Sequence, residues 1–218
     1  MKKTSRINRA TLAVLLIALI ATIVSVGATG ASGGGSVTIS TSSPIVQDFN
    51  SLSSTTTPST ALPVGWYLTE MGSGAAADGA YVVGTGSSNA GGAYSFGAAS
   101  DTERALGSVG SGTVAPIFLG AKFTNAGSGP IATLVVSFDG ELWRRGPSTN
   151  PDGLVFAYST NASDLTTGTF TSLPALNFTS PGNTCATAAG PTNGNSGNCR
   201  TTISGTIIDD TGGALPGV

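Results

Sequence analysis

The densest group of charged residues in the chain is a short segment that runs from Asp139 to Arg145. Asp139 and Glu141 are two positions apart, so they share one face if the segment is a β-strand. Two carboxylates on one face could act as the general acid and base of glycoside hydrolysis. The alternative is a polar strand edge, with Trp143 in the core and Arg144 or Arg145 paired to a carboxylate. We favour this structural interpretation, because no other part of the chain supplies a pocket of perturbed acids.

Carbohydrate binding is the second chemistry that these residue types allow. It would combine an exposed aromatic platform with carboxylate and amide groups that hydrogen-bond to sugar hydroxyls. Aromatic residues on strands are more often core residues, which is the alternative at each position. The aromatic candidates for the platform are Trp66, Tyr67, Tyr81 and Trp143. The ligand-binding residues that we predict are Trp66, Tyr67, Trp143, Asp139 and Glu141.

Other catalytic and metal chemistries lack their residues. The chain has no His, which excludes a Ser-His-Asp or Cys-His arrangement and, with only two Cys, a structural zinc site. Calcium ligation remains open, since carboxylate oxygens are available, but no Asp-x-Asp-x-Asp-Gly loop occurs. We therefore predict no catalytic residue and no resident cofactor. The calcium candidates are Asp139, Asp152, Asp209 and Asp210.

The N-terminus has the pattern of a secretory signal peptide. Residues 1–9 hold four of the nine basic residues, residues 10–26 are free of charge and largely apolar, and small residues follow. We predict a signal helix over residues 1–28 that is cleaved after Ala28. The alternative is an uncleaved membrane anchor, which would be the protein's only contact with a membrane. Removing four basic residues leaves five against eleven acidic ones, a net charge of −6, and this excludes a phosphate-binding surface for nucleic acid.

The two cysteines, Cys185 and Cys199, enclose a loop rich in Gly, Asn and Pro. In an exported protein such a pair is expected to form a disulfide. No Cys-x-x-Cys motif is present, so a redox role is not indicated. We predict that the bond fixes a long loop.

The rest of the chain alternates between short apolar segments and turns. Apolar residues recur at every second position over 117–123, 134–138 and 154–158, which predicts strands with one buried face. Weaker strand candidates are 45–49, 66–70, 80–84, 93–97, 104–108, 169–173, 175–179 and 201–208. Gly- and Pro-containing turns separate them, so we predict an all-β fold, a jelly-roll-like antiparallel β-sandwich. The predicted organisation is a signal peptide (1–28), a flexible Gly/Ser/Thr lead-in (29–44), a β-sandwich module (45–206) and the truncated start of a following β-domain (207–218).

Several phrases in order carry a family resemblance. They are Leu-Pro-Val-Gly-Trp-Tyr at 62–67, Gly-Thr-Gly-Ser-Ser-Asn-Ala-Gly-Gly-Ala-Tyr-Ser-Phe-Gly at 84–97, Glu-Arg-Ala-Leu-Gly-Ser at 103–108, Gly-Ala-Lys-Phe-Thr-Asn at 120–125, Val-Ser-Phe-Asp-Gly-Glu-Leu-Trp-Arg-Arg-Gly at 136–146 and Phe-Ala-Tyr-Ser at 156–159. The set resembles the N-terminal β-sandwich module of secreted bacterial multidomain surface and extracellular proteins, some of them nuclease-like. The module has no catalytic residues to carry over. Its usual sheet-completing strands do not follow Ile207; residues 204–218 instead resemble the opening of a carboxypeptidase-regulatory-like domain, which is similar to starch-binding domains.

These observations favour a non-catalytic module, secreted or on the cell surface, for adhesion or ligand binding. Carbohydrate is the first choice of ligand, and a surface or environmental polysaccharide is the expected partner. This choice rests on resemblance. Two alternatives remain: the N-terminal fragment of an extracellular nuclease or phosphoesterase, and a purely structural surface spacer.

Overall fold

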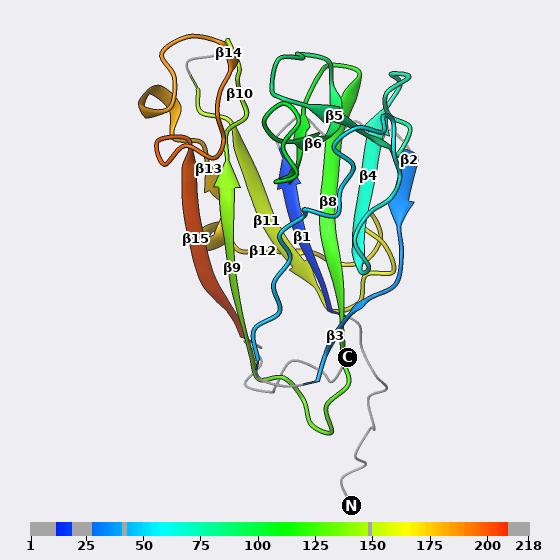
Figure 1. Ribbon diagram of the computed structural model, residues 1–218. Coiled ribbons are helices and arrows are strands. Elements are labelled where there is room, and N and C mark those ends of the chain that lie inside the picture. Colours follow the sequence, from blue (N-terminus) through cyan, green and yellow to red (C-terminus); the bar gives the residue numbers. More distant parts are fainter. Residues whose placement is uncertain (1–11, 19–27, 41–42, 148–149, 209–218) are drawn as a thin grey trace, which may run out of the picture.

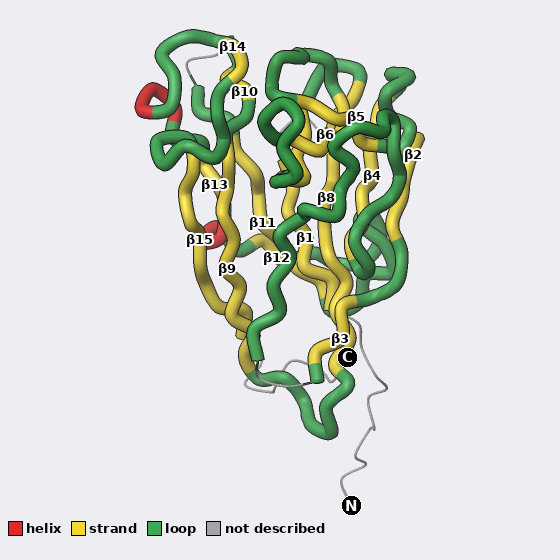
Figure 2. Tube along the Cα trace, viewed as in Figure 1, coloured by secondary structure: helices red, strands yellow, loops and turns green. Residues whose placement is uncertain are grey.

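The computed structural model describes residues 12–18, 28–40, 43–147 and 150–208, and these form an all-β sandwich (Figures 1 and 2). The all-β fold class is therefore confirmed. The described helical residues are two 3-10 turns, η1 (Pro174–Leu176) and η2 (Gly182–Thr184). In the described ranges, no helix has the length and hydropathy to cross a membrane.

One layer of the sandwich is a large sheet with the order β12-β11-β1-β8-β4-β2. Two short strands join it at its margins, β13 beside β11 and β3 beside β8. The β3–β8 pair is parallel, so the sheet is mixed rather than purely antiparallel. Its strands are β1 (Leu12–Ala18), β2 (Ala28–Gly33), β3 (Val37–Ile39), β4 (Trp66–Gly72), β8 (Val114–Asn125), β11 (Gly153–Ser159), β12 (Thr171–Ser172) and β13 (Phe178–Thr179).

The second layer consists of two smaller sheets. An antiparallel ribbon pairs β9 (Thr133–Glu141) with β15 (Arg200–Ile208) over nine residues of each strand. The other sheet has the order β5-β6-β7, in which β5 and β6 are parallel. Its strands are β5 (Tyr81–Gly84), β6 (Gly92–Phe96) and β7 (Ala105–Val109), and a further short pair is β10 (Arg144–Arg145) with β14 (Gly190–Pro191).

Apolar side chains join the two layers in separate clusters. Leu68, Ile117 and Leu119 of the large sheet pack with Tyr81 and Ala93 of the β5-β6-β7 sheet. A second cluster joins the β9–β15 ribbon to β11, and its fully buried members are Phe156, Leu176 and Ile207. The ribbon therefore covers the β11 side of the large sheet, while the β5-β6-β7 sheet covers the β4 and β8 side.

The strongest alternating segments form long strands as the sequence predicts. Residues 117–123, 134–138 and 154–158 lie within β8, β9 and β11. Five weaker segments lie in β4, β5, β6, β7 and β15, and two lie around the two-residue strands β12 and β13. Residues 45–49 are not a strand.

The segment predicted to be a flexible lead-in instead contains two strands, β2 and β3. The physical reason is the close approach that small residues permit. A Cβ at Gly30 would lie 2.0 Å from the backbone carbon of Asp78, and one at Gly33 would lie 2.2 Å from the carbonyl oxygen of Trp66. The glycines that led to the prediction of a flexible segment therefore allow β2 to lie close to β4 and to the 78–79 turn.

The segment predicted to be a signal helix is described only in part. Residues 12–18 form strand β1, which lies between β8 and β11 and pairs with both. This backbone is extended rather than helical, because both of its neighbours supply hydrogen-bonding partners along its length. Residues 1–11 and 19–27 of the predicted signal peptide, and residues 209–218 of the predicted following domain, lie outside the described residues.

Candidate functional site

Six polar side chains meet near the end of the β9–β15 ribbon, and we call them the polar cluster. Its members are Glu103, Asp139, Glu141, Asn195, Arg200 and Thr202. The strand register explains the central part of it, because Arg200 is opposite Glu141 and Thr202 is opposite Asp139. Directly opposed residues of an antiparallel pair share a face. The sequence therefore placed the two carboxylates correctly on one strand, but their partners come from residues sixty positions away.

Asp139 is held by two groups on β15. The Thr202 hydroxyl donates to its Oδ1 at 2.5 Å, and the Arg200 guanidinium donates to its Oδ2 and forms a salt bridge. The Thr202 hydroxyl, and then the Arg200 charge, lower the pKa of Asp139 below its ordinary value of 3.8. The pair therefore presents two functions at the protein surface: the ionised carboxylate of Asp139 accepts hydrogen bonds and the guanidinium of Arg200 donates them.

Glu141 lies on the same strand in a drier setting. Burial raises the pKa of its carboxyl, and the negative charge of nearby Glu103 raises it further, while the Trp143 indole lowers it. The Trp143 Nε1 donates to Glu141 Oε2 at 2.8 Å. Across the cluster, the Asn195 side chain donates to Glu103 Oε2 at 2.6 Å. The cluster thus contains two carboxylates whose pKa values shift in opposite directions.

Trp143 is a core residue. Its side chain is 4% exposed and packs with Tyr94 and Phe96, with its ring centroid 6.3 Å from that of Phe96. An added Cβ at Gly194 would lie 2.3 Å from the Trp143 Nε1, so the 186–198 loop covers the indole. An indole in this position has no free face for a sugar ring, so Trp143 does not offer the stacking platform that the sequence predicted there.

The two arginines after Trp143 do not pair with the carboxylates of this segment. Arg144 donates to the carbonyl oxygens of Gly86 and Ser87 at 2.9 and 3.0 Å. Arg145 donates to the carbonyl oxygen of Ala186. The expected ion pair is therefore formed by Arg200 instead, because β10 turns away from β9 to pair with β14.

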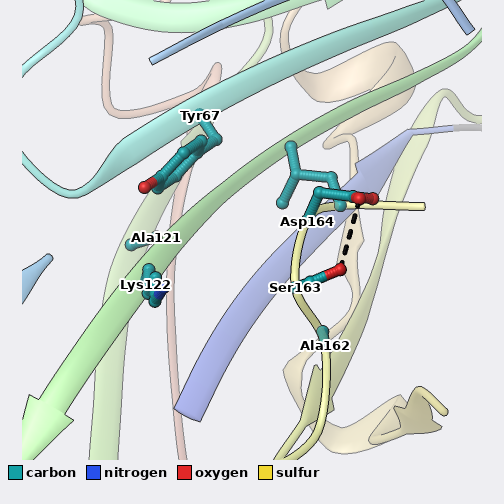
Figure 3. A pocket seen from close by; sticks show the side chains of 7 residues that line it. Tyr67, Ala121, Lys122, Ala162, Ser163 and Asp164 are labelled. Carbon is teal, nitrogen blue, oxygen red and sulfur yellow. Dashed lines mark hydrogen bonds between the residues drawn. The ribbon is translucent and has the colours of Figure 1, made fainter. Parts of the chain in front are cut away.

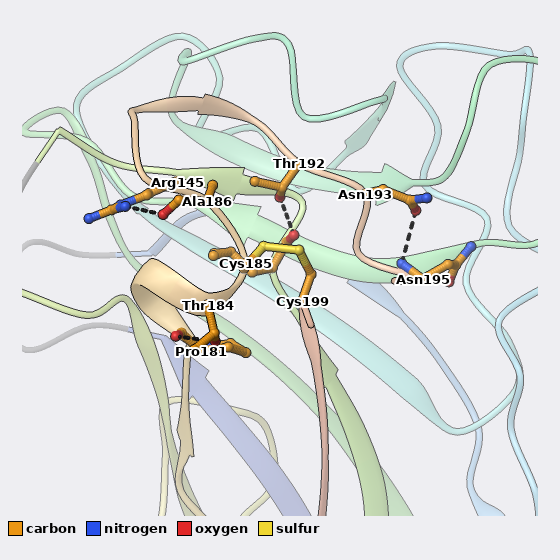
Figure 4. The surroundings of a disulfide bond; sticks show 10 residues. Arg145, Pro181, Thr184, Cys185, Ala186, Thr192, Asn193, Asn195 and Cys199 are labelled. Carbon is orange, nitrogen blue, oxygen red and sulfur yellow. Dashed lines mark hydrogen bonds between the residues drawn. A yellow bond between two sulfur atoms is a disulfide. The ribbon is translucent and has the colours of Figure 1, made fainter. Parts of the chain in front are cut away.

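The predicted disulfide between Cys185 and Cys199 is formed (Figure 4). Its cysteines are 14 positions apart, and Cys199 immediately precedes β15. Two further hydrogen bonds hold the enclosed loop. Asn195 N–H donates to Asn193 Oδ1 within the loop, and the Thr192 hydroxyl donates to the carbonyl of Leu142, which directly follows β9. The loop carries Asn195, so the disulfide fixes one wall of the polar cluster. A formed disulfide is consistent with an oxidising compartment.

The remaining predicted aromatic residues lie on β4 of the large sheet and on β5 of the second layer, away from the ribbon (Figure 1). Trp66 is partly buried and packs edge-to-face on Phe49, with ring centroids 4.6 Å apart. Tyr67 is partly buried and its hydroxyl donates to the Gly35 carbonyl at 2.6 Å. Tyr81 is fully buried. The structure therefore brings Trp143, Asp139 and Glu141 together, and it places Trp66 and Tyr67 elsewhere.

A small cavity lies beside Tyr67, between β8 and the 162–165 loop (Figure 3). Its volume is about 10 Å³, room for about one water molecule and too small for a sugar ring. Asp164 stands at its edge. Burial raises the pKa of its carboxyl, but four hydrogen bonds from Thr166 and Thr167 outweigh this effect and lower the pKa to about 2. These hydrogen bonds hold the carboxylate within its own turn.

Within the described ranges, no group of three or more His, Cys, Asp or Glu side chains is arranged to hold a metal ion. Asp152 accepts a hydrogen bond from Gly146 N–H at 3.3 Å, as a turn residue does, and Asp139 binds Arg200. The other two calcium candidates, Asp209 and Asp210, lie outside the described residues.

Sequence reasoning did not identify Glu103, Asn195, Arg200 and Thr202 as members of this site. Their only local signals are that Thr202 lies on the predicted strand 201–208, that Arg200 directly precedes this strand, and that Asn195 lies in the predicted disulfide loop. Comparisons with protein-family models, with curated proteins and with solved structures find no match to this chain.

Proposed function

We propose that this chain is a secreted, non-catalytic module for adhesion or ligand binding, and that carbohydrate is its ligand class. The observation that carries the proposal is the polar cluster at the disulfide-bonded end of the ribbon. It offers carboxylate, amide, guanidinium and hydroxyl groups within one small area, which are the groups that hydrogen-bond to sugar hydroxyls.

The arrangement of the cluster favours binding over hydrolysis. Asp139 holds its charge through Arg200 and Thr202, and Glu141 receives the Trp143 indole, so both carboxylates already have partners that fix their orientation. Pre-organised side chains on strands lose little conformational entropy when a ligand binds. The disulfide next to β15 supports secretion, because such bonds persist in oxidising compartments.

A glycan array probed with the full chain tests the proposal. We expect retention of at least one class of polysaccharide, and a loss of affinity of about tenfold or more in an Asp139→Ala, Asn195→Ala double variant, since charged hydrogen bonds contribute about 1.5–3 kcal/mol each. Ser137→Ala is the matched control, because Ser137 is an exposed residue on the same face of β9.

Trp66→Ala is the second arm of the experiment. Loss of binding in Trp66→Ala but not in the double variant would move the site to the start of β4. A folded protein that retains no glycan would contradict the proposal and leave the structural spacer as the better interpretation.

A further inference from the structure

We infer that residues 53–61, which we call the threonine loop, are a site of O-glycosylation whose acceptors are Thr55, Thr56 and Thr60. The inference rests on the secretion part of the proposed function, because it concerns the form of the chain that leaves the cell. The loop has the sequence Ser-Ser-Thr-Thr-Thr-Pro-Ser-Thr-Ala. Segments rich in Ser and Thr that also contain Pro are typical of O-glycosylated regions.

The ends of the threonine loop are held by one core residue. Tyr81 is fully buried, and its hydroxyl accepts a hydrogen bond from Ser53 N–H at 3.0 Å and donates one to the Ala61 carbonyl at 2.9 Å. The Tyr81 backbone pairs with that of Ser59 through two hydrogen bonds of 2.9 Å. A loop whose ends are fixed on the core presents its middle residues to solvent in a defined position, which favours recognition by an enzyme.

Three hydroxyl groups of the loop hold its own backbone. The Ser53 hydroxyl oxygen accepts two backbone N–H groups of the next turn, at 3.2 and 2.6 Å. The Thr57 hydroxyl oxygen accepts Val83 N–H at 3.4 Å, and that of Ser59 accepts Ala61 N–H at 3.2 Å. These three residues therefore have a structural role that accounts for their hydroxyl groups.

The hydroxyl groups of Thr55, Thr56 and Thr60 have no such role. All three residues are exposed, and their hydroxyls have no hydrogen-bond partner among the described residues. The 164–167 turn shows the contrast, because both of its threonine hydroxyls donate to the Asp164 carboxylate. Three exposed hydroxyl groups without a structural partner are thus gathered in one loop, where each can act as an acceptor.

The backbone of the loop is irregular at the acceptors. Pro58 has no N–H group and restricts the residue before it to extended conformations, which excludes a helix. Residues 54–58 accordingly lie in no helix or strand. Thr206 is also exposed, but it lies within β15 and its backbone is part of the pairing with β9. A transferase can enclose an acceptor in a protruding loop more readily than one in a paired strand.

The proposed reaction transfers one glycosyl group to a threonine. The threonine Oγ1 attacks the anomeric carbon of a sugar that is activated as a nucleotide or polyprenyl phosphate ester. The bond between that carbon and the phosphate oxygen breaks, and the hydroxyl proton passes to a base of the transferase. The products are an O-glycosyl threonine and the phosphate leaving group, with no change of oxidation state.

The test compares the full chain recovered from the medium of secreting cells with the same chain made in a cell-free system that lacks sugar donors. Mass spectrometry is performed on proteolytic peptides that contain the threonine loop, so cleavage near the N-terminus does not affect the result. We expect the secreted peptide to be heavier by one or more hexose or N-acetylhexosamine residues attached to Thr55, Thr56 or Thr60. Equal masses, or a phosphate at these positions in place of a sugar, would overturn the inference.

Three variants sharpen the assignment. The triple variant Thr55→Ala, Thr56→Ala, Thr60→Ala should lose all of the added mass, whereas the corresponding triple change to Ser should keep it, because Ser retains the hydroxyl. Thr206→Ala is the matched control, since it removes an exposed threonine hydroxyl from a strand, and it should also keep the added mass. Sugar retained in the Ala variant, or lost in the Ser variant, would contradict the assignment.

Failure of this inference is distinguishable from failure of the proposed function. The cell-free chain carries no sugar and can be used for the glycan array, so the array result does not depend on the modification. Secreted protein of unmodified mass overturns only the inference. Protein retained entirely inside the cells would overturn the proposed secretion and this inference with it.

Discussion

Two regions of the molecule hold charged side chains in opposite ways. At the junction of β4 and β6, Glu70 is fully buried, and its two carboxylate oxygens accept backbone hydrogen bonds from Ala93 at 2.6 Å and Gly79 at 2.9 Å. Arg104, which directly precedes β7, is 2% exposed and donates to the hydroxyl and carbonyl of Ser95 on β6. In the polar cluster, by contrast, Asp139 and Arg200 bind each other at the surface.

The difference separates buried charges that hold backbone groups from an exposed ion pair that our proposal assigns to ligand binding. A buried carboxylate that satisfies backbone donors cannot be removed without leaving those donors unpaired. A surface ion pair contributes little to folding because water and salt screen it. We therefore expect changes in the first region to affect the free energy of unfolding and changes in the second to affect binding.

The largest expected effect is that of Glu70→Ala. It leaves the amides of Gly79 and Ala93 buried without their acceptors, at a cost of about 1–3 kcal/mol each, so the free energy of unfolding should fall by about 4 kcal/mol. Urea unfolding followed by circular dichroism measures it. If the free energy of unfolding fell by less than about 1 kcal/mol, Glu70 would contribute no more to stability than a surface ion pair, which would contradict the difference between the two regions.

Removal of the disulfide by Cys185→Ser, Cys199→Ser comes next. The unfolded chain gains the entropy of the open loop, which corresponds to about 3 kcal/mol in the chain-entropy model. Thermal unfolding of the variant and of the parent with and without reductant gives two independent values. Their agreement is expected; a variant as stable as the oxidised parent would contradict the assigned role of the bond.

A third prediction concerns the loop that covers Trp143. Gly194→Ala places a methyl group against the indole and should destabilise the protein by about 2 kcal/mol, as overpacking does. Gly197→Ala in the same loop meets nothing within 4 Å and should change stability by less than about 0.5 kcal/mol. Trp143 fluorescence should shift in the first variant only.

Glu70 and Asp139 should contribute to the pH dependence of stability with opposite signs. Burial raises the pKa of Glu70 above its ordinary 4.5, so the unfolded chain releases this proton first and stability falls as the pH rises through the folded-state value. Glu70→Gln should reduce that fall and leave the part that comes from Glu141, whose pKa is also raised. The pKa of Asp139 is lowered, so its contribution is present above pH 3.8 and is lost as the pH falls, and Asp139→Asn should reduce that loss and leave the part that comes from Asp164. Unfolding curves between pH 3 and 7 measure both slopes.

The smallest expected effect is that of Asp139→Ala on stability. An exposed ion pair contributes about 0.2–1 kcal/mol, so the free energy of unfolding should fall by about 0.5 kcal/mol. The same variant is expected to weaken glycan binding. A small loss of stability together with a large loss of binding would distinguish the polar cluster from the Glu70 region most clearly. A loss as large as that of Glu70→Ala would contradict it.

The sequence predicted those parts of the fold that depend on local alternation. The strands around Leu119, Val136 and Phe156 have one buried face, and period-two patterns report that directly. The sequence did not predict β2, because its small residues show no alternation of apolar and polar side chains. Its glycines fit instead by allowing a close approach of the neighbouring backbone. The sequence also could not place Arg200 beside Asp139. Their proximity depends on how β9 and β15 pair across sixty residues, and the residue composition of the two strands does not specify that register.

The position of the disulfide has a mechanical consequence for a protein exposed to force. Tension applied beyond Ile208 would peel β15 from β9 one residue pair at a time, starting at Ile208 and Thr133. The peeling would reach Cys199, where the load passes through the sulfur–sulfur bond to Cys185 and bypasses the loop between them. The ribbon would then extend only by the length of β15. The loop that carries Asn195 would bear no tension during this extension.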